Sequence, residues 1–488
     1  MTRVFPSSSA ASVQALDGHR LGEALAQTER AVEGARNCRR EHALLALILL
    51  QLGRTADADR TVARALALDS AGDAETYDGL AYVSMRLGEH ERANRLYQRA
   101  TQIAPADPGL SYNLACSERS LGRLAAAESA CDRALASDPD HYPSYLLRAE
   151  LRSQSPDNHH VDAMQRALER RPTDHRARMF LGYALGKELD DLGRFDEAFV
   201  YFDLAARARR EHLDYDVATD ERKIRRIIEV YDRAHVAPTI GDEAVDVSAQ
   251  FVFVVGLPRS GTTLVERVLT GLAGVRSNGE TDNFSNALLR AATGDGDVFA
   301  RAARAEPAKV AAEYIRLARP GAAAIRIVEK LPLNYLYLGA IHRALPRAKI
   351  LLLRRSPIDS CFAMFRTLFA AGYPFTYDLH DLARYYSAYD RLIDHWRGLV
   401  GSQLMEIDYE RLVRDPLTVG AEIATHCELT WDAAATEIER NPTASWTASA
   451  AQVRRPIYSS SVGRWRNYRR QLEPLITMLR NCGIAASD

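Results

Sequence analysis

This sequence is poor in lysine, in regularly spaced cysteine and in long apolar runs. Of its 63 basic residues, all are arginine except Lys187, Lys223, Lys309, Lys330 and Lys349. The six cysteines form no CxxC motif and follow no regular spacing. In a chain of 488 residues this indicates reduced thiols, not a disulfide framework or a cysteine zinc site.

Membrane and nucleic-acid signals are also lacking. The longest apolar run, Ala43–Leu50, is far shorter than the roughly 20 residues that a spanning helix needs. The first residues include no apolar stretch of signal-peptide length. A net charge of −1 gives no general attraction to nucleic acid or anionic membranes. We therefore expect a cytoplasmic protein of two or three domains, with no membrane span and no nucleic-acid partner.

The first two hundred residues carry a repeated pattern. A Leu-Gly dipeptide recurs about every 34 residues, with one gap of about two periods, and ends at Gly53, Gly88, Gly122 and Gly193. Alanines keep the same period, and prolines follow the second half of three units at Pro105, Pro139 and Pro172. We expect Leu-Gly to end the first helix of each unit and proline to follow the second. The pattern resembles tetratricopeptide (TPR) repeats, of which we expect about five.

The TPR resemblance implies an all-α helical domain over residues 1–210, then a helix and a linker over residues 211–248. TPR solenoids bind peptides or partner proteins. Bracing a second domain or building a homodimer explains the repeats equally well, so the sequence leaves their role open.

The stretch FVFVVGLPRSGTT, residues 251–263, predicts a strand, a glycine loop and the start of a helix. Phe251–Val255 is a short apolar run, typical of a buried strand in a parallel sheet. Gly256 and Gly261 interrupt it, and apolar residues at helical spacing follow Thr262. A helix N-terminus behind such a loop points backbone N–H groups at an anion. We predict a phosphate or sulfate site here, with Arg259 as its fixed charge.

The same loop separates two kinds of phosphate chemistry. A nucleotide-triphosphate loop reads GxxxxGK followed by Ser or Thr, but Thr262 stands at the lysine position here. The PRSGTT loop instead resembles the 5′-phosphosulfate loop of sulfotransferases that use 3′-phosphoadenosine 5′-phosphosulfate (PAPS). This resemblance implies a PAPS-binding sulfotransferase domain over residues 249–488. It also implies that the co-substrate is bound by Pro258, Arg259, Ser260, Gly261, Thr262 and Thr263.

Two further motifs resemble the catalytic segments of these enzymes. Glu280 lies in GETDNF, where tyrosylprotein sulfotransferases and their bacterial relatives carry a catalytic base. Lys330 follows an apolar run in EKLPLN, where the family carries a lysine that stabilises charge on the leaving group. The resemblance implies catalytic roles for Glu280, Lys330 and Arg259. We also expect Asn334 to cap the next helix.

Basic residues in the last third of the chain extend the resemblance. Arg355, after the apolar run KILLL, matches the family's ligand for the 3′-phosphate, a dianion that suits a planar guanidinium. A serine that usually follows is Ala363 here, so one expected hydrogen bond is missing, unless Ser360 or another hydroxyl replaces it. Residues 447–465 resemble the tail that folds over the nucleotide. The resemblance implies Ser449 as a second donor at the sulfuryl group, and nucleotide contacts from Arg454, Arg455, Arg464 and Trp465.

Together these patterns predict a TPR solenoid followed by a P-loop-like parallel α/β sulfotransferase domain, with its site at the carboxyl ends of the strands. The expected reaction moves the sulfuryl group from PAPS to a hydroxyl or amine, while Glu280 accepts the proton. No metal is expected, because a sulfuryl group carries less charge than a phosphoryl group. The acceptor cannot be read from the sequence.

Two alternatives from other classes stay open. One is a non-catalytic TPR scaffold with a degenerate nucleotide site, for which Ala363 argues. The other is a P-loop kinase, against which Thr262 argues.

Overall fold

The chain divides into two units, Met1–Pro172 and Thr173–Asp488. The computed structural model describes residues 21–70, 72–233, 247–318, 325–369, 372–441, 443 and 451–485. Within these ranges no helix combines the length and the apolar character needed to cross a membrane.

The described elements of the first unit are helices. They are α2 (Leu21–Gly34), α3 (Arg39–Gln51), α4 (Thr55–Ala67), α5 (Ala74–Arg86), α6 (His90–Ile103), α7 (Pro108–Ser120), α8 (Leu124–Ser137), α9 (Tyr142–Leu151) and α10 (Val161–Arg170). Helices α3 and α4, α5 and α6, and α7 and α8 pack as pairs.

Each Leu-Gly dipeptide of this unit follows a helix end, as the sequence predicts. After α3 the backbone turns at Gly53, whose φ is 73°, and the N–H of Arg54 donates to Leu49 O at 2.8 Å. Gly88 and Gly122 take the same left-handed backbone after α5 and α7. A left-handed residue stops a helix by turning the next N–H groups back onto its last carbonyls, and glycine does so without steric cost. The helix-turn-helix repeat is confirmed.

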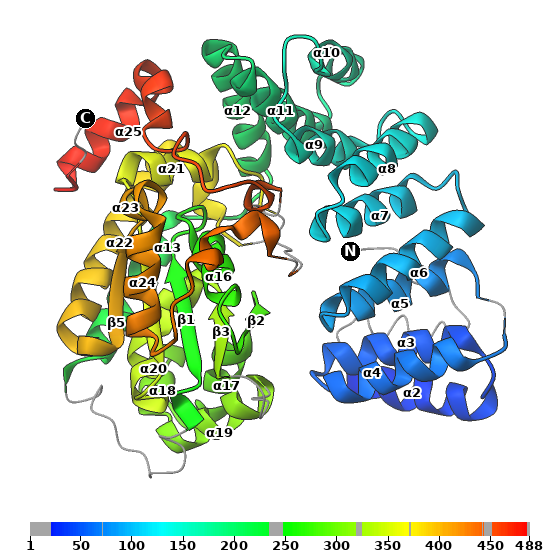
Figure 1. Cartoon of the computed structure of the whole chain (residues 1–488), viewed down its shortest axis with the longest axis horizontal. Helices are drawn as coiled ribbons and strands as arrows, with labels where there is room; N and C mark the ends of the chain where they lie inside the picture. The colour runs from blue at the N-terminus through cyan, green and yellow to red at the C-terminus, as the bar shows by residue number, and fades with distance from the viewer. Residues whose placement is uncertain are drawn as a thin grey trace. The chain divides into compact units, whose positions relative to one another are not determined.

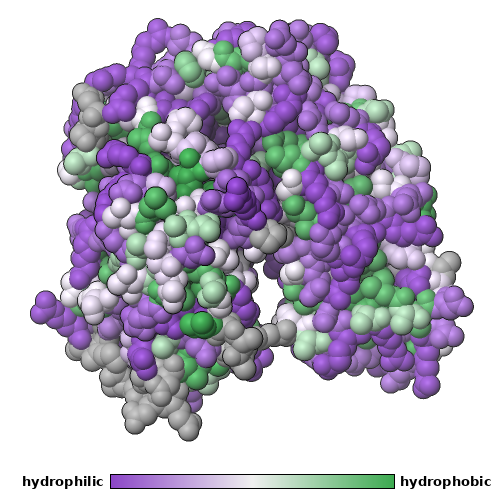
Figure 2. Space-filling model, in the orientation of Figure 1, coloured by the Kyte–Doolittle hydropathy of each residue, from purple (hydrophilic) through white to green (hydrophobic). Residues whose placement is uncertain are grey.

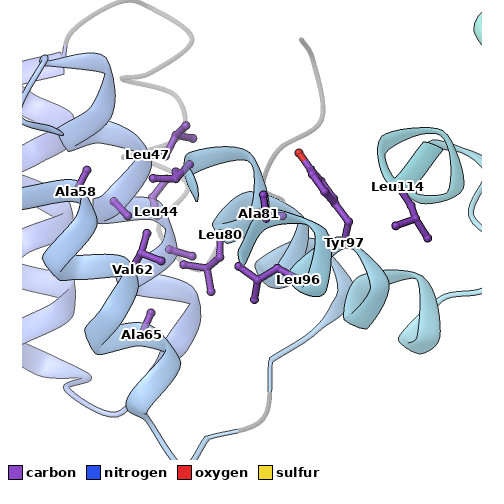
Figure 3. Packing of buried hydrophobic residues seen from close by; sticks show 14 of the residues in the cluster. Leu44, Leu47, Ala58, Val62, Ala65, Leu80, Ala81, Leu96, Tyr97 and Leu114 are labelled. Atoms are coloured by element: carbon purple, nitrogen blue, oxygen red, sulfur yellow. The ribbon is translucent and has the colours of Figure 1, made fainter. Parts of the chain in front are cut away.

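Small side chains let the paired helices approach closely. Ala58 and Ala65 on α4 and Ala81 on α5 are fully buried in one cluster with Leu44 and Leu80. Figure 3 shows leucine side chains of α3 and α5 lying beside the alanine side chains of the neighbouring helices. Burying one leucine side chain contributes about 1.5–3 kcal/mol. The first unit therefore has an apolar core of its own.

The second unit begins with three more helices, α11 (His175–Asp191), α12 (Phe195–Arg210) and α13 (Val217–Val230). Helices α11 and α12 form another pair, and Gly193 follows α11 with a φ of 74°. This pair contacts the rest of its unit directly, because Tyr183 OH donates to Phe365 O at 3.2 Å. Helix α13 lies within the expected helix-and-linker segment, most of whose remainder, residues 234–246, falls outside the described residues.

The remaining elements of the second unit alternate strands with helices. The strands are β1 (Phe251–Gly256), β2 (Val275–Gly279), β3 (Arg326–Lys330), β4 (Lys349–Arg354) and β5 (Leu404–Asp408). The helices are α16 (Thr262–Thr270), α17 (Asn283–Ala291), α18 (Val298–Arg304), α19 (Pro307–Ala318), α20 (Leu338–Ala344), α21 (Pro357–Phe365), α22 (Leu379–Val400), α23 (Tyr409–Arg414), α24 (Pro416–His426) and α25 (Arg469–Asn481). Short 3₁₀ helices are η1 (Pro332–Tyr337), η2 (Pro374–Tyr377), η3 (Gly401–Gln403), η4 (Ala433–Thr436), η5 (Ile438–Arg440), η6 (Gln452–Arg454) and η7 (Arg464–Tyr468).

The five strands form one parallel sheet in the order β2-β3-β1-β4-β5 (Figure 1). Phe253 of β1 lies opposite Glu329 of β3 and Ile350 of β4. The chain fills one side of β1 with β2 and β3 and then the other side with β4 and β5. Sheets of this kind bind ligands outside the carboxyl ends of the strands, where the order reverses. The expected parallel α/β sheet is confirmed, and β1 stands at the reversal.

Both faces of the sheet are covered. On one face Val252 and Val254 pack in a cluster with residues of α16 and α24. On the other face the rings of Phe251 and Phe253 lie 4.8 and 5.6 Å from the ring of Tyr314 on α19. Burial on both faces explains why β1 is apolar throughout instead of alternating. Figure 2 shows a mainly hydrophilic outer surface on the face in view, with apolar residues in separate small patches.

Candidate active site

The carboxyl edge of the sheet brings together the residues that the sequence singled out. The glycine loop, residues 257–261, follows β1, and Glu280 directly follows β2. Lys330 is the last residue of β3, and Arg355 directly follows β4. The four segments belong to the same unit.

The glycine loop turns sharply in front of α16. Arg259 and Gly261 both have left-handed backbone, with φ of 67° and 106°. A Cβ on Gly261 would lie 2.5 Å from Cδ2 of Tyr409, so glycine is required there. A non-glycine residue held in this region, as Arg259 is, costs about 1–3 kcal/mol, and such strain concentrates at functional sites. Behind the loop, α16 begins at Thr262, and the N–H of Leu264 in its first turn donates to Gly261 O at 2.9 Å. The first N–H groups of a helix have no preceding turn to bond to and can therefore bind an anion.

Ser260 is the buried polar residue of the loop. Its side chain is 1% exposed, and within the described residues its Oγ has no hydrogen-bond partner. A buried hydroxyl left in this state costs about 1–3 kcal/mol. A Cβ on Gly256 would lie 3.0 Å from this Oγ, so the strand end also leaves no room for a larger residue. The loop therefore holds a hydroxyl that an anion's oxygen would satisfy.

Arg355 lies against the glycine loop. Its Nη1 donates to Arg259 O at 3.0 Å and its Nη2 to Ser461 O at 2.6 Å. Its Cζ lies 4.8 Å from the ring centre of Tyr409. The Nε of Arg355 is buried and finds no partner in the part of the chain that the structure describes. The side chain of Arg259 reaches Gln452, with Nη2 donating to Oε1 at 3.0 Å.

Glu280 and Lys330 form an ion pair at the ends of β2 and β3. The Lys330 side chain is fully buried, whereas that of Glu280 is 41% exposed. Lys330 Nζ also lies 3.6 Å from Glu266 Oε2, and Ser277 Oγ donates to Glu266 Oε1 at 2.6 Å. Burying an ammonium group costs several kcal/mol unless carboxylates compensate it. The cluster thus places a carboxylate that solvent can reach beside a buried, fixed cation.

Asp359 of α21 anchors the backbone of the C-terminal segment at Gly463 and Trp465. Its carboxylate accepts the backbone N–H of Gly463 at 2.6 Å and that of Trp465 at 3.3 Å. Trp465 is buried, and the Cζ of Arg466 lies 5.4 Å from the centre of its ring. These bonds fix the backbone close to Ser461, which contacts both Arg355 and Tyr409.

Arg464 pairs with a residue of the helical pair α11–α12. Asp190, at 2% side-chain exposure, contacts Arg464 and lies 2.7 Å from Nη1 of Arg366. Tyr468 OH donates to the same carboxylate at 2.5 Å. Burial alone would raise the pKa of Asp190, but the two arginines and the hydroxyl outweigh it and hold the pKa below the ordinary value of 3.8.

Arg454 and Arg455 are the other two basic residues that the resemblance places at the nucleotide, together with Arg464. Arg454 donates to Asn441 O at 2.8 Å and to Thr443 O at 3.0 Å. It stands near Arg267 of α16, whose pKa falls to about 10 through burial and the charge of Arg454. Arg455 is exposed. Ser449, the predicted second donor at the sulfuryl group, lies outside the described residues.

The two neighbouring arginines at the end of β4, Arg354 and Arg355, contact different partners. Arg354 donates to Asp390 Oδ1 at 2.6 Å and lies 5.6 Å from the ring centre of Tyr389. Ala363 is buried in α21, and Ser360 uses its hydroxyl to donate to Arg355 O at 3.3 Å. The hydroxyl that could replace the missing serine is therefore already bonded to the backbone of Arg355.

The segment after Lys330 differs from the prediction. A 3₁₀ helix, η1, begins at Pro332, and the α-helix starts only at Leu338. Asn334 does not cap a helix but lies inside η1, 1% exposed. Its side-chain oxygen and nitrogen have no hydrogen-bond partner among the described residues. The prediction was wrong because proline at the first position suits either type of helix.

Several residues of the site escaped the sequence prediction. Glu266 follows Thr262 by one helical turn, so helical periodicity could have placed it on the same face of α16. Tyr409 begins α23 after β5, and its place at a strand's carboxyl end is a signal that could have found it. Ser461 and Asp190 carried no signal, because their partners lie far away in the sequence.

Other features of the surface do not involve these residues. A shallow hollow of about 740 Å³ is lined by Met405, Leu417, Thr418, Ala421, Glu422, Thr425 and His426. Asp378, His380 and Asp381 lie close enough together to offer oxygen and nitrogen ligands to a metal ion. Their geometry has a simpler cause, because Asp378 Oδ1 caps α22 by accepting the N–H groups of His380 and Asp381 at 2.8 and 2.9 Å.

Comparison with known families separates the two parts of the chain. Residues 251–433 match the model of the sulfotransferase family, and residues 84–151 match a tetratricopeptide-repeat model. The sulfotransferase match covers β1 to α24 and contains the glycine loop, Glu280, Lys330 and Arg355. It supports sulfuryl transfer as the general chemistry of this domain.

Two individual relatives match at less than 30% identity. A protein of Aquifex aeolicus (strain VF5) of unassigned activity is 29% identical over 399 residues, which is 79% of this chain and 52% of that protein. A Caenorhabditis briggsae protein, provisionally named a protein-tyrosine sulfotransferase, is 28% identical over 178 residues, 34% of this chain and 61% of that protein. The chain thus spans between half and two thirds of the length of these relatives.

Among solved structures, the sulfotransferase domain of the Synechococcus PCC 7002 olefin synthase aligns with a TM-score of 0.33 at 20% identity, covering 44% of this chain and 86% of that domain. The chain joins a TPR-like helical region, residues 21–230, to a parallel-sheet α/β domain that is similar to the sulfotransferase family over residues 251–433.

Proposed function

We propose that the protein transfers the sulfuryl group of PAPS to a hydroxyl or amine acceptor. One observation carries the proposal: the anion-binding groups of the glycine loop and the Glu280–Lys330 pair meet at the same edge of the sheet. A site that only held a phosphate would need the loop but not a solvent-accessible carboxylate beside a buried lysine.

The residues present suit PAPS. The N–H groups at the start of α16 and the Ser260 hydroxyl offer donors to the 5′-phosphosulfate, and Arg355 offers a guanidinium to the 3′-phosphate. The buried donors of Ser260 and Arg355 that lack partners within the described part favour an external acceptor. Arg259, Arg454, Arg455 and Arg464 supply further positive charge, although Arg464 already pairs with Asp190.

The proposed reaction is an in-line displacement at sulfur. A bond forms between the acceptor oxygen or nitrogen and sulfur, while the bond from sulfur to the 5′-phosphate oxygen breaks. Glu280 accepts the proton that the acceptor loses, because its carboxylate is exposed enough to meet an incoming molecule. Lys330 stabilises the charge that builds on the departing phosphate, and 3′-phosphoadenosine 5′-phosphate (PAP) leaves.

The acceptor and the partners remain predictions. The TPR-like helices favour a peptide or protein partner by their usual role, and a homodimer is the competing explanation. A cytoplasmic location stays a prediction as well.

A non-catalytic nucleotide-binding scaffold is the second candidate. It is favoured by the state of Arg355, whose two terminal nitrogens already donate to Arg259 O and Ser461 O. It is also favoured by Ala363, which offers no hydroxyl. A P-loop kinase draws no support from the site, because Thr262 occupies the position of the phosphate-binding lysine.

Calorimetric titration with PAP tests the nucleotide site, and transfer from radiolabelled PAPS to a panel of phenols, alcohols and amines tests the chemistry. Arg355→Ala removes the proposed ligand, and Arg354→Ala is the matched control because Arg354 binds Asp390 instead. We expect PAP binding in the wild type and in Arg354→Ala, and its loss in Arg355→Ala. Binding without transfer to any acceptor would favour the scaffold, and absence of binding to folded protein would overturn the proposal.

A further inference from the structure

Glu329, the residue before Lys330, lies on the opposite side of β3 from the lysine side chain, because neighbouring residues of a strand point to opposite faces. It is 1% exposed. Burial raises the pKa of its carboxyl group above the ordinary value. A buried carboxylate near a site is costly unless its oxygens are bonded, so its partners indicate what it stabilises.

Three of those partners lie on both sides of Glu280 in the chain, and Tyr314 of α19 also faces the carboxyl group. Asn278 Nδ2 donates to Glu329 Oε1 at 2.6 Å, and Asn283 Nδ2 donates to the same oxygen at 3.3 Å. Thr281 Oγ1 donates to Glu329 Oε2 at 2.7 Å. One carboxylate thus receives bonds from residues before and after Glu280.

The backbone at this point is irregular and needs such support. The pairing of β2 with β3 shifts between Ser277 and Gly279, where Gly279 comes opposite Glu329. Gly279 has a φ of 70°, and its N–H donates to Ser277 Oγ at 2.9 Å. Bulges of this kind redirect side chains near active sites. Here the irregularity turns Asn278 toward Glu329 and sends the chain on to Glu280.

We propose that Glu329 is a positioning residue that fixes the segment 278–283 so that the Glu280 carboxylate stays beside Lys330. This inference rests on the proposed function of Glu280. The Glu329-Lys330 dipeptide then acts on Glu280 in two ways: Glu329 holds the chain on either side of it, and Lys330 contacts its carboxylate directly.

Two substitutions test the role in different places. Glu329→Gln keeps the shape but replaces one acceptor oxygen by an amide donor that faces other donors. Thr281→Val removes a single bond without altering the buried carboxyl group, so it remains informative where Glu329→Gln folds poorly. Thr281→Ser, which keeps the hydroxyl, is the matched control.

Hydrogen–deuterium exchange of the segment 277–284 gives a readout that needs no substrate. We expect faster exchange there in Glu329→Gln and, to a smaller extent, in Thr281→Val, with the glycine loop unchanged and PAP affinity within about twofold of the wild type. Exchange that is unchanged at 277–284 in both variants, or raised equally throughout the second unit, would overturn the positioning role.

Turnover supplies the second readout, with radiolabelled PAPS and tyramine, which offers a phenol hydroxyl and an amine. Displacing a catalytic group by about 1 Å costs up to 10²-fold in rate, so we expect Glu329→Gln to lower kcat about 10- to 100-fold with little change in KM for PAPS. In the E280Q background the same substitution should cost less than about twofold, because it acts through Glu280. Equal losses in both backgrounds would overturn the proposal.

The two proposals fail in different ways. If no acceptor is sulfated by the wild type, the proposed reaction fails while the exchange experiment still decides whether Glu329 orders the segment. If the wild type turns over and Glu329→Gln does so equally fast, the reaction stands and the positioning role fails.

Discussion

Two sides of the candidate site differ in how far their polar groups are satisfied within the chain. On the loop side, formed by residues 257–261 and Arg355, the Ser260 hydroxyl and the Arg355 Nε are buried without partners among the described residues. On the acid side, formed by Glu266, Glu280 and Lys330, the buried ammonium group is compensated by two carboxylates.

This difference separates binding from chemistry. A buried donor without a partner costs about 1–3 kcal/mol, and an incoming anion recovers that cost. The loop side is therefore arranged to gain on ligand binding. The acid side gains little from a bound nucleotide, because its charges are already paired. Substitutions on the two sides should consequently separate turnover from affinity.

The largest expected effect is on the acid side. Glu280→Gln keeps the size of the side chain but removes its basicity, and we expect turnover of PAPS to fall by about 10²- to 10⁴-fold. PAP affinity should change less than about threefold, because the loop side is untouched. Single-turnover kinetics with radiolabelled PAPS and calorimetry with PAP measure the two quantities. Full turnover in this variant would show that Glu280 is not the base.

The next largest effect is expected on the loop side, where a substitution should lower PAP affinity. Arg355→Ala should weaken PAP binding by about 30-fold or more, because a buried charge-assisted bond is worth roughly 2–5 kcal/mol when one partner is removed. Arg354→Ala should leave PAP affinity within about twofold. A loss of similar size in both variants would mean that the arginines act through the fold and that the comparison between the sides is wrong.

The general architecture was predictable because its signals are local. Leu-Gly dipeptides mark helix ends, because glycine adopts the left-handed backbone conformation more easily than other residues. The apolar run Phe251–Val255 predicts a strand buried on both faces. The order of the strands then brings Arg259, Glu280, Lys330 and Arg355 to one edge. Each of these residues could be placed from its position at or just after the end of a strand.

The remaining partners depend on tertiary contacts that no local pattern encodes. Asp190 meets Arg464 across more than half of the chain, and Asp359 holds the backbone of Gly463. The sequence resemblance predicted Arg464 at the nucleotide, a role that stays untested while its guanidinium pairs with Asp190. Nor could the sequence predict η1, because the choice between a 3₁₀ and an α-helix after Pro332 depends on packing around Asn334.

A smaller effect tests the state of Ser260. Ser260→Ala removes a buried hydroxyl that lacks a partner in the described free protein, so the free energy of unfolding should stay equal or rise slightly. PAP affinity should fall by about fivefold, the value of one hydrogen bond of about 1 kcal/mol. Thermal unfolding with and without PAP measures both changes, and Ser260→Thr is the control that keeps the hydroxyl. A variant that loses stability without ligand would show that the hydroxyl is satisfied in the free protein.

The smallest expected effect at neutral pH concerns Asp190 and Glu329, two buried carboxyl groups that belong neither to the loop side nor to the acid side. Asp190 faces Arg366, Arg464 and the Tyr468 hydroxyl, and its pKa is lowered; Glu329 faces neutral donors, and burial raises its pKa. A lowered folded-state pKa stabilises the protein above the ordinary value of 3.8, and this contribution is lost as the pH falls through the folded pKa.

The pH dependence of the Glu329 contribution has the opposite sign, because its carboxyl group binds a proton more tightly in the folded protein. Its contribution to the free energy of unfolding therefore falls as the pH rises above the ordinary pKa of glutamate. Urea unfolding between about pH 6 and 3 distinguishes the two cases. The free energy of unfolding of the wild type should exceed that of Asp190→Asn by less and less as the pH falls. The free energy of unfolding of Glu329→Gln, relative to that of the wild type, should be highest at the upper end of the pH range. Parallel curves for all three proteins would mean that neither carboxyl group titrates differently in the folded and unfolded chains.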